Sequence, residues 1–314
     1  MLNRLTRSLA AVAVFALWSL GLANSAAAAV LEVGPGRAYT SIGAAARAAK
    51  DGDTVQVRAG EYRADVAVWT QRRLDIRAVG GRARLVANGA YAEGKGIWVV
   101  RGGDIRVQGF DFVGARVPDR NGAGIRFERG QLTVVDCLFE DNENGILTGA
   151  DPLAELAIER SVFRSNGAGD GYSHNLYVGR IARLTVKNSE FRDARVGHLL
   201  KSRAAATDIR DSQFVDSDAG QTSYQLEFPN GGVVTVSGSR VRQGPATSNS
   251  TMVSYGAEGY NWPTNELVMR NNTLVDDRPS NGVYLRVRAG DRKVVLEGNR
   301  LEGTSRTRAK VLTY

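Results

Sequence analysis

Cysteine and histidine are scarce in this 314-residue chain, which contains one cysteine, Cys137, and two histidines, His174 and His198. A single cysteine excludes an intrachain disulfide, and there is no cluster of Cys and His. Cys137 lies in segment 134–139, which is apolar apart from Asp136 and predicts a buried and unreactive thiol. The stability of the fold therefore has to come from continuous packing.

Long apolar runs are also missing, except at the N-terminus. Arg4 and Arg7 are followed by the apolar run 9–22, and residues 27–29 are alanines of the kind that a signal peptidase accepts. The run is too short for a comfortable membrane span, which needs about 20 apolar residues. Residues 1–29 are therefore predicted to be a cleaved signal peptide, and we expect a periplasmic or secreted protein with no membrane anchor.

The chain contains no run of basic residues that resembles a nucleic-acid-binding arm. The formal net charge is +8, and it is +6 once Arg4 and Arg7 are removed with the signal peptide. For an exported protein, a basic surface favours acidic polysaccharide as a partner over nucleic acid. Residues 30–314 suit one large domain with a substantial core, and we expect a monomer.

A short motif, polar residues ending in a large apolar one, recurs along the chain. Its last residues are spaced 27, 24, 28, 23, 27, 33 and 27 apart. They are Phe112, Phe139, Phe163, Phe191, Phe214, Val241, Leu274 and Leu301. The segments between them are β-branched and interrupted by Gly, Asn and Asp, which excludes a helical repeat.

Each repeat contains two or three short strands, such as 132–135 before the motif and 145–148 after a turn. A coil of this size, with every strand pairing to its counterpart one turn later, buries an apolar ladder along the axis. The sequence thus predicts an all-β fold, a right-handed parallel β-helix. The main rival, a β-propeller, needs longer antiparallel strands and hairpin turns that the sequence lacks.

The opening of the chain fits a capped solenoid. Residues 39–50 predict an amphipathic helix that covers the first coil, and residues 52–60 predict the strand that opens it. The segment from Val33-Gly34-Pro35 to Gly60-Glu61-Tyr62 resembles the entry of bacterial proteins of the pectate-lyase-like β-helix superfamily. That resemblance covers nearly all of the mature chain and implies the fold, whereas the reaction differs among members.

Superposing the strands that follow the motif places equivalent residues in columns. With Ile97, Ile125, Ile146, Leu176, Leu200 and Leu226 pointing inward, the next residue of each strand points outward. The outward column is Trp98, Arg126, Leu147, Tyr177, Lys201 and Glu227, continued by Tyr255 and Arg286. We interpret Trp98 and Arg126 either as surface residues or as distant subsites.

Both histidines fall at equivalent positions on adjacent coils, about 5 Å apart by strand spacing. The predicted catalytic cluster consists of His174, Tyr177, His198, Lys201 and Arg203. The predicted substrate-binding residues are Asn175, Tyr224, Gln225, Glu227, Tyr255 and Trp262. Loop 167–173 and the insertion 256–266 are expected to form the two walls of a cleft.

These side chains suit β-elimination on a uronic-acid polysaccharide. Arg203 or Lys201 would bind the carboxylate. His198, His174 or Lys201 would remove the neighbouring proton, and Tyr177 or a histidine would protonate the leaving oxygen. β-Helix lyases that act on pectate, alginate or dermatan resemble this scheme, but no clustered carboxylates supply their calcium ligands here, so the need for calcium stays open.

Three other functions remain open from the sequence. C5-epimerisation uses the same proton abstraction as elimination. Glycoside hydrolysis needs two carboxyl groups about 5–10 Å apart, for which Glu227 and Asp170 are the candidates. A non-catalytic β-helix would bind a polysaccharide or serve as a stalk, but it would spread its basic and aromatic groups more evenly along the groove.

Overall fold

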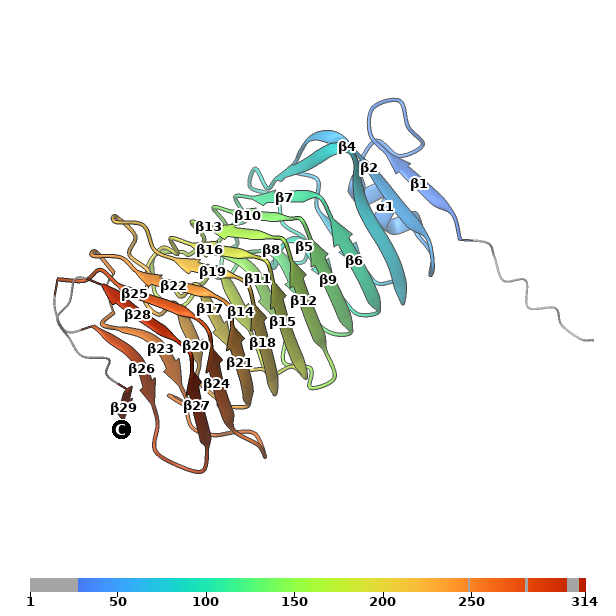
Figure 1. Cartoon of the computed structure of the whole chain (residues 1–314). Helices are drawn as coiled ribbons and strands as arrows, with labels where there is room; N and C mark the ends of the chain where they lie inside the picture. Colours follow the sequence, from blue (N-terminus) through green and yellow to red (C-terminus); the bar gives the residue numbers. More distant parts are fainter. Residues whose placement is uncertain (1–27, 248, 280–281, 304–310) are drawn as a thin grey trace, which may run out of the picture.

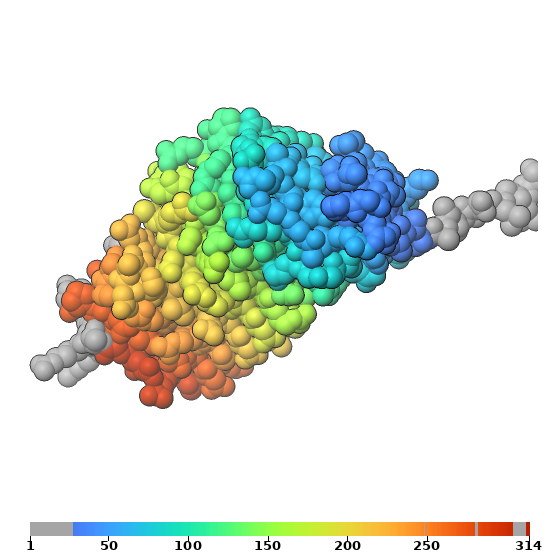
Figure 2. Space-filling view, turned by 90° about the horizontal axis from the view of Figure 1, so that it is seen from above, coloured from blue at the N-terminus to red at the C-terminus, as the bar shows by residue number. Residues whose placement is uncertain are grey.

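The computed structural model describes residues 28–247, 249–279, 282–303 and 311–314. Apart from residues 28 and 29, the predicted signal peptide lies outside them. The described chain winds into a parallel β-solenoid that runs from β1 at the blue end to β29 at the red end (Figure 1). Successive coils appear as bands of colour along the long axis (Figure 2). The predicted parallel β-helix is therefore confirmed.

Three faces of parallel strands surround the core, and the pairing within each face is parallel throughout the described residues. Over these residues, two faces share the long strands β2 and β4 and form one 19-stranded sheet. Its strands are β1(Val30–Val33), β2(Thr54–Arg63), β4(Arg73–Val86), β6(Asp104–Gln108), β7(Phe110–Val113), β9(Gln131–Val135), β10(Leu138–Glu140), β12(Glu155–Glu159), β13(Val162–Arg164), β15(Arg183–Lys187), β16(Glu190–Arg192), β18(Ala206–Arg210), β19(Gln213–Val215), β21(Val233–Ser237), β22(Arg240–Gln243), β24(Glu266–Arg270), β25(Thr273–Asp276), β27(Lys293–Glu297) and β28(Arg300–Gly303).

The third face carries the candidate site. Within the described ranges it is a ten-stranded sheet in which strands from consecutive coils are direct neighbours. These strands are β3(Ala67–Trp69), β5(Gly96–Val100), β8(Ala123–Phe127), β11(Asn144–Thr148), β14(Leu176–Val178), β17(Leu200–Ser202), β20(Leu226–Phe228), β23(Thr251–Tyr255), β26(Val283–Val287) and β29(Val311–Thr313).

The apolar end of the repeated motif forms the spine of the core. The eight motif residues from Phe112 to Leu301 pair in register from coil to coil, as predicted. The five phenylalanines at the start of this series stack face to face, with ring centroids 4.5–5.0 Å apart. Stacking of these fully buried rings contributes dispersion and hydrophobic energy at each of the five coils.

The polar start of the motif makes the turn before each phenylalanine. Its first residue takes a left-handed conformation, as at Asp136, Asn188 and Gly238, and Asp, Asn and Gly tolerate this conformation best. The next residue belongs to a buried ladder in which each backbone N–H donates to the side chain one coil further on. The ladder is Cys137, Ser161, Ser189, Ser212, Ser239, Asn272 and Asn299.

Cys137 begins this ladder and is buried, as predicted. Burial raises the pKa of its thiol to about 12, so the thiol stays protonated at neutral pH. The sulfur therefore packs in the core and takes no part in nucleophilic chemistry.

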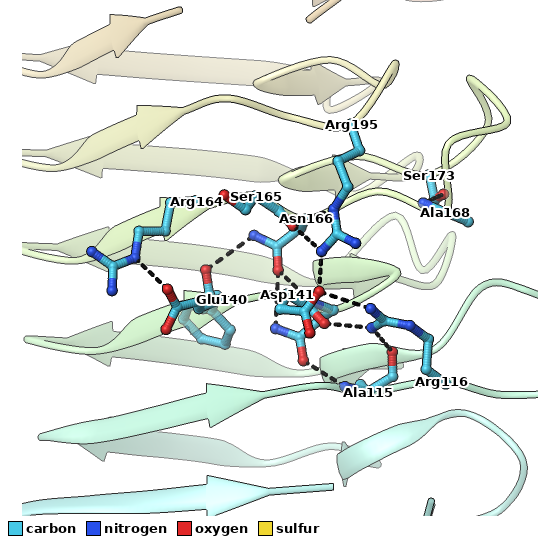
Figure 3. A network of polar contacts seen from close by, with 12 residues as sticks. Ala115, Arg116, Glu140, Asp141, Arg164, Ser165, Asn166, Ala168, Ser173 and Arg195 are labelled. Carbon is cyan, nitrogen blue, oxygen red and sulfur yellow. Dashed lines mark hydrogen bonds and ion pairs between the residues drawn. The ribbon is translucent and has the colours of Figure 1, made fainter. Parts of the chain in front are cut away.

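A second corner of the solenoid is held by charge as well as by amides (Figure 3). Asp141 accepts hydrogen bonds from Arg116, at 2.8 Å, and from Arg195, so one carboxylate ties three coils together. Behind it, Asn142 and Asn166 continue a buried amide ladder, with 3.0 Å between the Asn142 Nδ2 and Asn166 Oδ1 atoms. This corner fixes the start of the loop that leads to the candidate site.

The predicted capping helix is present but shorter than expected. Helix α1(Ile42–Ala48) begins after Ser41, whose side chain accepts from the Ala44 backbone N–H. Asp65 accepts from the Ile42 and Gly43 N–H groups, so a second side chain caps the same end. The helix contacts β1 and β3 and buries its apolar side against the first coils.

The outward position predicted for Trp98 is wrong. It pairs with Ile125, so the register differs by one residue from the predicted alignment of Ile97 with Ile125. The indole is fully buried and packs edge-on against Trp69, Phe110 and Phe112. The large ring fills the first coils of the core, and Trp98 therefore contributes no subsite.

No helix among the described residues is long and apolar enough to cross a membrane.

We expect Phe163→Ala to destabilise the solenoid by about 3–5 kcal/mol, because it removes a buried ring and leaves a cavity between two stacked neighbours. Denaturant unfolding followed by far-UV circular dichroism measures the effect. Tyr172→Ala, which truncates a side chain in a residue that is 85% exposed, is the matched control and should leave the unfolding midpoint nearly unchanged. Equal shifts for the two variants would contradict the role of the phenylalanine stack.

Candidate functional site

The strand register brings the predicted outward column together on consecutive coils. Leu147 pairs with Tyr177, Tyr177 with Lys201, and Lys201 with Glu227. Arg126 extends the column in the other direction through its pairing with Leu147. Adjacent members are thus one strand spacing, about 4.8 Å, apart along the axis.

A groove of about 700 Å³ runs over this column. Its walls include Tyr172 from loop 167–173 and Glu258 from insertion 256–266, so both predicted walls contribute. The residues that line it are Asn121, Arg126, Asn144, Leu147, Thr148, Gly149, Ala150, Gly171, Tyr172, His174, Tyr177, Gly179, Arg180, Lys201, Arg203 and Glu258.

Loop 167–173 is held by its own polar side chains. Asp170 accepts hydrogen bonds from the Tyr172 N–H and from the Ser173 hydroxyl. Ser173 Oγ in turn accepts from the Ala168 N–H at 2.7 Å, and both of these residues appear at the edge of Figure 3. The carboxylate of Asp170 is therefore used inside the loop.

Both histidines belong to a third ladder that links four coils. The His174 N–H donates to Asn144 Oδ1 at 2.9 Å, and the His198 N–H donates to His174 Nδ1 at 3.0 Å. The Tyr224 N–H donates to His198 Nδ1 at 3.2 Å. Because each Nδ1 accepts a hydrogen bond, each neutral ring carries its proton on Nε2.

The two imidazole rings stack with their centroids 4.4 Å apart. Burial, with the neighbouring His198, Lys201 and Arg203, holds the pKa of His174 well below its usual 6.5. Burial also lowers the pKa of His198, although its hydrogen bond to Glu227 opposes this shift. Both rings are therefore neutral at neutral pH and present Nε2–H groups as donors.

The Glu227 carboxylate lies close to two nitrogen atoms of the cluster. Its Oε2 lies 3.1 Å from His198 Nε2 and 2.8 Å from Lys201 Nζ. Burial alone would raise the pKa of Glu227, but His198 and Lys201 lower it to about 2. The carboxylate is thus ionised at any pH at which the protein would work.

Arg203 is engaged on two sides. Its guanidinium forms a bidentate ion pair with Glu258, with 2.9 Å from Nε to Oε2 and 2.5 Å from Nη2 to Oε1. Its Nη1 donates to the Tyr177 hydroxyl oxygen. Lys201 Nζ also lies 3.6 Å from Glu258, so both cations of the cluster face internal carboxylates.

Tyr177 lies at the centre of this arrangement and lines the groove. Its ring stacks on His174, with centroids 5.4 Å apart, and the Arg203 guanidinium lies 5.1 Å from its ring centroid. Since Arg203 donates to the hydroxyl oxygen, the phenolic proton is directed elsewhere. The structure therefore brings all five predicted catalytic side chains together.

The predicted substrate-binding residues are mostly placed elsewhere. Asn175 is buried and belongs to the corner ladder, where it accepts from Asn166 and donates to backbone carbonyls. Gln225 is also fully buried. Tyr224 packs edge-on against His198 next to the groove, while Glu227 serves the cluster as described.

The outward placement predicted for Tyr255 is wrong. Tyr255 pairs with Phe228 and points into the core, and Ser254 takes the outward position next to Glu227. The Tyr255 hydroxyl donates to the Gly232 carbonyl, 2.7 Å away. Arg286 does continue the outward column, since it pairs with Ser254.

Trp262 lies near the groove, but its indole N–H and one face of its ring already contact other residues of the protein. The Nε1–H donates to the Arg203 carbonyl at 3.2 Å, and the Arg180 guanidinium covers the ring at 4.9 Å from its centroid. Arg180 and Glu258 were not predicted as site residues from the sequence. Two features of the sequence could have identified them. Glu258 lies within insertion 256–266, and Arg180 follows the end of β14 by two residues.

Among the described residues, no group of three or more His, Cys, Asp or Glu side chains could hold a metal ion.

Comparison with solved structures agrees with the fold. The chain is similar to an alginate lyase from Paenibacillus sp. str. FPU-7, with a TM-score of 0.60, 13% identity, and coverage of 91% of this chain and 97% of that one. Escherichia coli YbhC gives a TM-score of 0.44 at 12% identity, with coverage of 87% of this chain and 84% of that one. No family model and no curated protein matches the sequence.

We predict that acidification from about pH 7 to about pH 5 destabilises the protein. Each histidine has a folded-state pKa below 6.5, so the unfolded chain takes up protons first and stability is lost as the pH falls. Glu227 adds a loss at lower pH, since its pKa is about 2 in the folded state against an ordinary value of 4.5. Thermal melting over this pH range measures the effect.

His174→Asn is the informative variant for this prediction. The Asn Oδ1 can accept the His198 N–H in place of Nδ1, but the side chain does not titrate. Its melting temperature should change less between pH 7 and pH 5 than that of the wild type. The same dependence in both proteins would mean that His174 is not buried in its neutral form.

Proposed function

We propose that this protein is a carbohydrate-active β-helix enzyme, a lyase that cleaves a uronic-acid polysaccharide by β-elimination. The observation that carries the proposal is the Tyr177 hydroxyl, which lines an open groove and receives a hydrogen bond from Arg203. Elimination requires a proton acceptor and donor beside positive charge, and Lys201 pairs with Tyr177 on the next coil.

Tyr177 suits the proton transfer better than the other members of the cluster. The Nδ1 atoms of both histidines accept backbone N–H groups, and their Nε2 atoms carry protons. Lys201 Nζ lies 2.8 Å from Glu227 and 3.6 Å from Glu258, so it is already engaged by two internal carboxylates. The tyrosine oxygen has neither restriction.

The proposed reaction balances without an added oxidant or metal. After its own phenolic proton has passed to solvent, the Tyr177 oxygen takes the proton from C5, the carbon next to the uronate carboxylate. The electron pair of that C–H bond forms the C4–C5 double bond, and the bond from C4 to the leaving glycosidic oxygen breaks. Tyr177 then donates the proton that it took from C5 to the leaving oxygen.

The neighbouring groups would stabilise the negative charge that builds up on the carboxylate during proton removal. Lys201 and Arg203 supply N–H donors beside Tyr177, although Glu227 and Glu258 balance their charges, and His174 supplies an Nε2–H that has no hydrogen-bond partner among the described residues. Donors that are already oriented lower the barrier without reorganisation.

The arrangement gives less support to glycoside hydrolysis. A hydrolase needs one carboxyl group with a raised pKa to act as the acid. Glu227 has a pKa of about 2, and backbone and hydroxyl donors with Arg120 lower the pKa of Asp170, against the effect of its burial. Neither candidate is therefore a proton donor near neutral pH.

One comparison and one expectation from the sequence are consistent with a lyase. The solved structure with a TM-score of 0.60 is titled an alginate lyase, so the same solenoid supports that chemistry in another protein. Expected export through a signal peptide would bring this protein into contact with extracellular polymers.

The first test is to incubate the protein with alginate, pectate and a glycosaminoglycan and to follow the absorbance of the unsaturated uronate. We expect activity on at least one polymer, and Tyr177→Phe should lower kcat by about 10²-fold or more because it removes only the transferring oxygen. Tyr91→Phe, which removes a hydroxyl from an exposed tyrosine that does not line the groove, is the matched control and should retain activity.

The products also separate the proposal from its alternatives. New reducing ends without the double bond would indicate a hydrolase, and proton exchange at C5 without chain cleavage would indicate an epimerase. Binding without any chemical change would indicate a non-catalytic role. Each of these results would contradict the proposed elimination.

A further inference from the structure

The positive charge at the centre of the groove is already neutralised by the protein. Lys201 and Arg203 contribute two positive charges, and Glu227 and Glu258 contribute two negative charges within 3.6 Å of them. The histidines are neutral. The centre therefore has no net charge with which to attract an acidic polymer.

Two other cations, Arg126 and Arg180, line the groove outside this centre. Arg126 lies 3.3 Å from Glu128, which also pairs with Lys95 at 2.5 Å. Arg180 lines the groove as well, and among the residues that the structure describes no carboxylate pairs with it. Among the described residues, Arg180 is thus the one groove-lining cation that has no carboxylate within ion-pair distance.

Arg180 is also held in position. Its guanidinium lies 4.9 Å from the centroid of the Trp262 ring, and its Nη2 donates to the Asn261 carbonyl at 3.4 Å. Trp262 is in turn tied to the Arg203 carbonyl. A guanidinium stacked on an aromatic face keeps its remaining N–H donors free at the edge, in the fork that matches a carboxylate.

We propose that Arg180, positioned by Trp262, is the residue that binds a carboxylate of the polysaccharide in this groove. The inference rests on the proposed function and names the group that selects an acidic substrate. It also gives Trp262 a role different from sugar stacking, because the ring face is covered by Arg180. Arg203 then holds Tyr177 and remains paired with Glu258.

The main alternative is that the substrate displaces Glu258 from Arg203. Glu258 would then be a stand-in for the substrate carboxylate, and removing its charge would free Arg203 and tighten binding. The alternative therefore predicts that Glu258→Gln binds the acidic polymer more tightly, whereas the role proposed for Arg180 predicts no tighter binding. This difference makes Glu258→Gln the discriminating variant.

The experiment is isothermal titration of the purified protein with a mannuronate trisaccharide and, as the neutral probe, with mannotriose. Arg180→Gln should weaken binding of the acidic trisaccharide about tenfold, which corresponds to about 1.4 kcal/mol, with no change for the neutral one. Arg240→Gln is the matched control, since it removes the same charge from an exposed position in β22 on another face. The affinity of Arg240→Gln for the acidic trisaccharide should equal that of the wild type.

A second variant tests the positioning. Trp262→Leu should weaken binding of the acidic trisaccharide less than Arg180→Gln does, and the double variant should bind no more weakly than Arg180→Gln alone. A Trp262 that contacted sugar directly would instead lower the affinity for the neutral probe too, or add its loss to that of Arg180. Either result would overturn the positioning role.

The remaining outcomes separate failure of the inference from failure of the proposed function. Equal losses for Arg180→Gln and Arg240→Gln, or tighter binding by Glu258→Gln, would overturn the role of Arg180 while leaving an acidic substrate in place. A wild-type protein that does not prefer the acidic trisaccharide, and has no activity on the uronate polymers, would overturn the proposed function and this inference together.

Discussion

The parallel hydrogen bonds between coils keep equivalent residues one strand spacing, about 4.8 Å, apart. This constraint turns a loose sequence repeat into continuous columns. The phenylalanine spine is one such column, and the hydroxyl and amide ladder that includes Ser189 is another. The same spacing places Tyr177 between Leu147 and Lys201 on the outer face. Packing and site geometry therefore have a common origin.

The histidine ladder shows how a structural device limits the chemistry of a site. Backbone N–H groups occupy Nδ1 of His174 and His198, which fixes the proton on Nε2. A histidine in that state donates well but does not abstract a proton without giving up a hydrogen bond. In the proposed reaction the proton transfer is therefore carried out by Tyr177, whose oxygen accepts a hydrogen bond from Arg203 and which lines the groove.

Electrostatic balance divides the groove into two parts. Around Tyr177, cations and carboxylates compensate one another, so the reacting groups are held in a rigid network at little net charge. Beyond it, Arg180 lies over Trp262 without such compensation. The two proposals thus give the binding of a polyanion and the chemistry to different residues of one surface.

The repeat in the sequence was sufficient to predict the solenoid, its motif register and the cluster around Tyr177, because period and alternation alone decide which residues of regular coils stack. Prediction failed where coils are irregular. Trp98 and Tyr255 lie one position from their expected places, and a shift of one residue moves a side chain from the surface to the core. The tautomers of the histidines, the ion pair of Glu258 with Arg203 and the isolation of Arg180 were decided only by the tertiary structure. Each depends on loops and side chains from separate coils, whose distances no sequence period specifies.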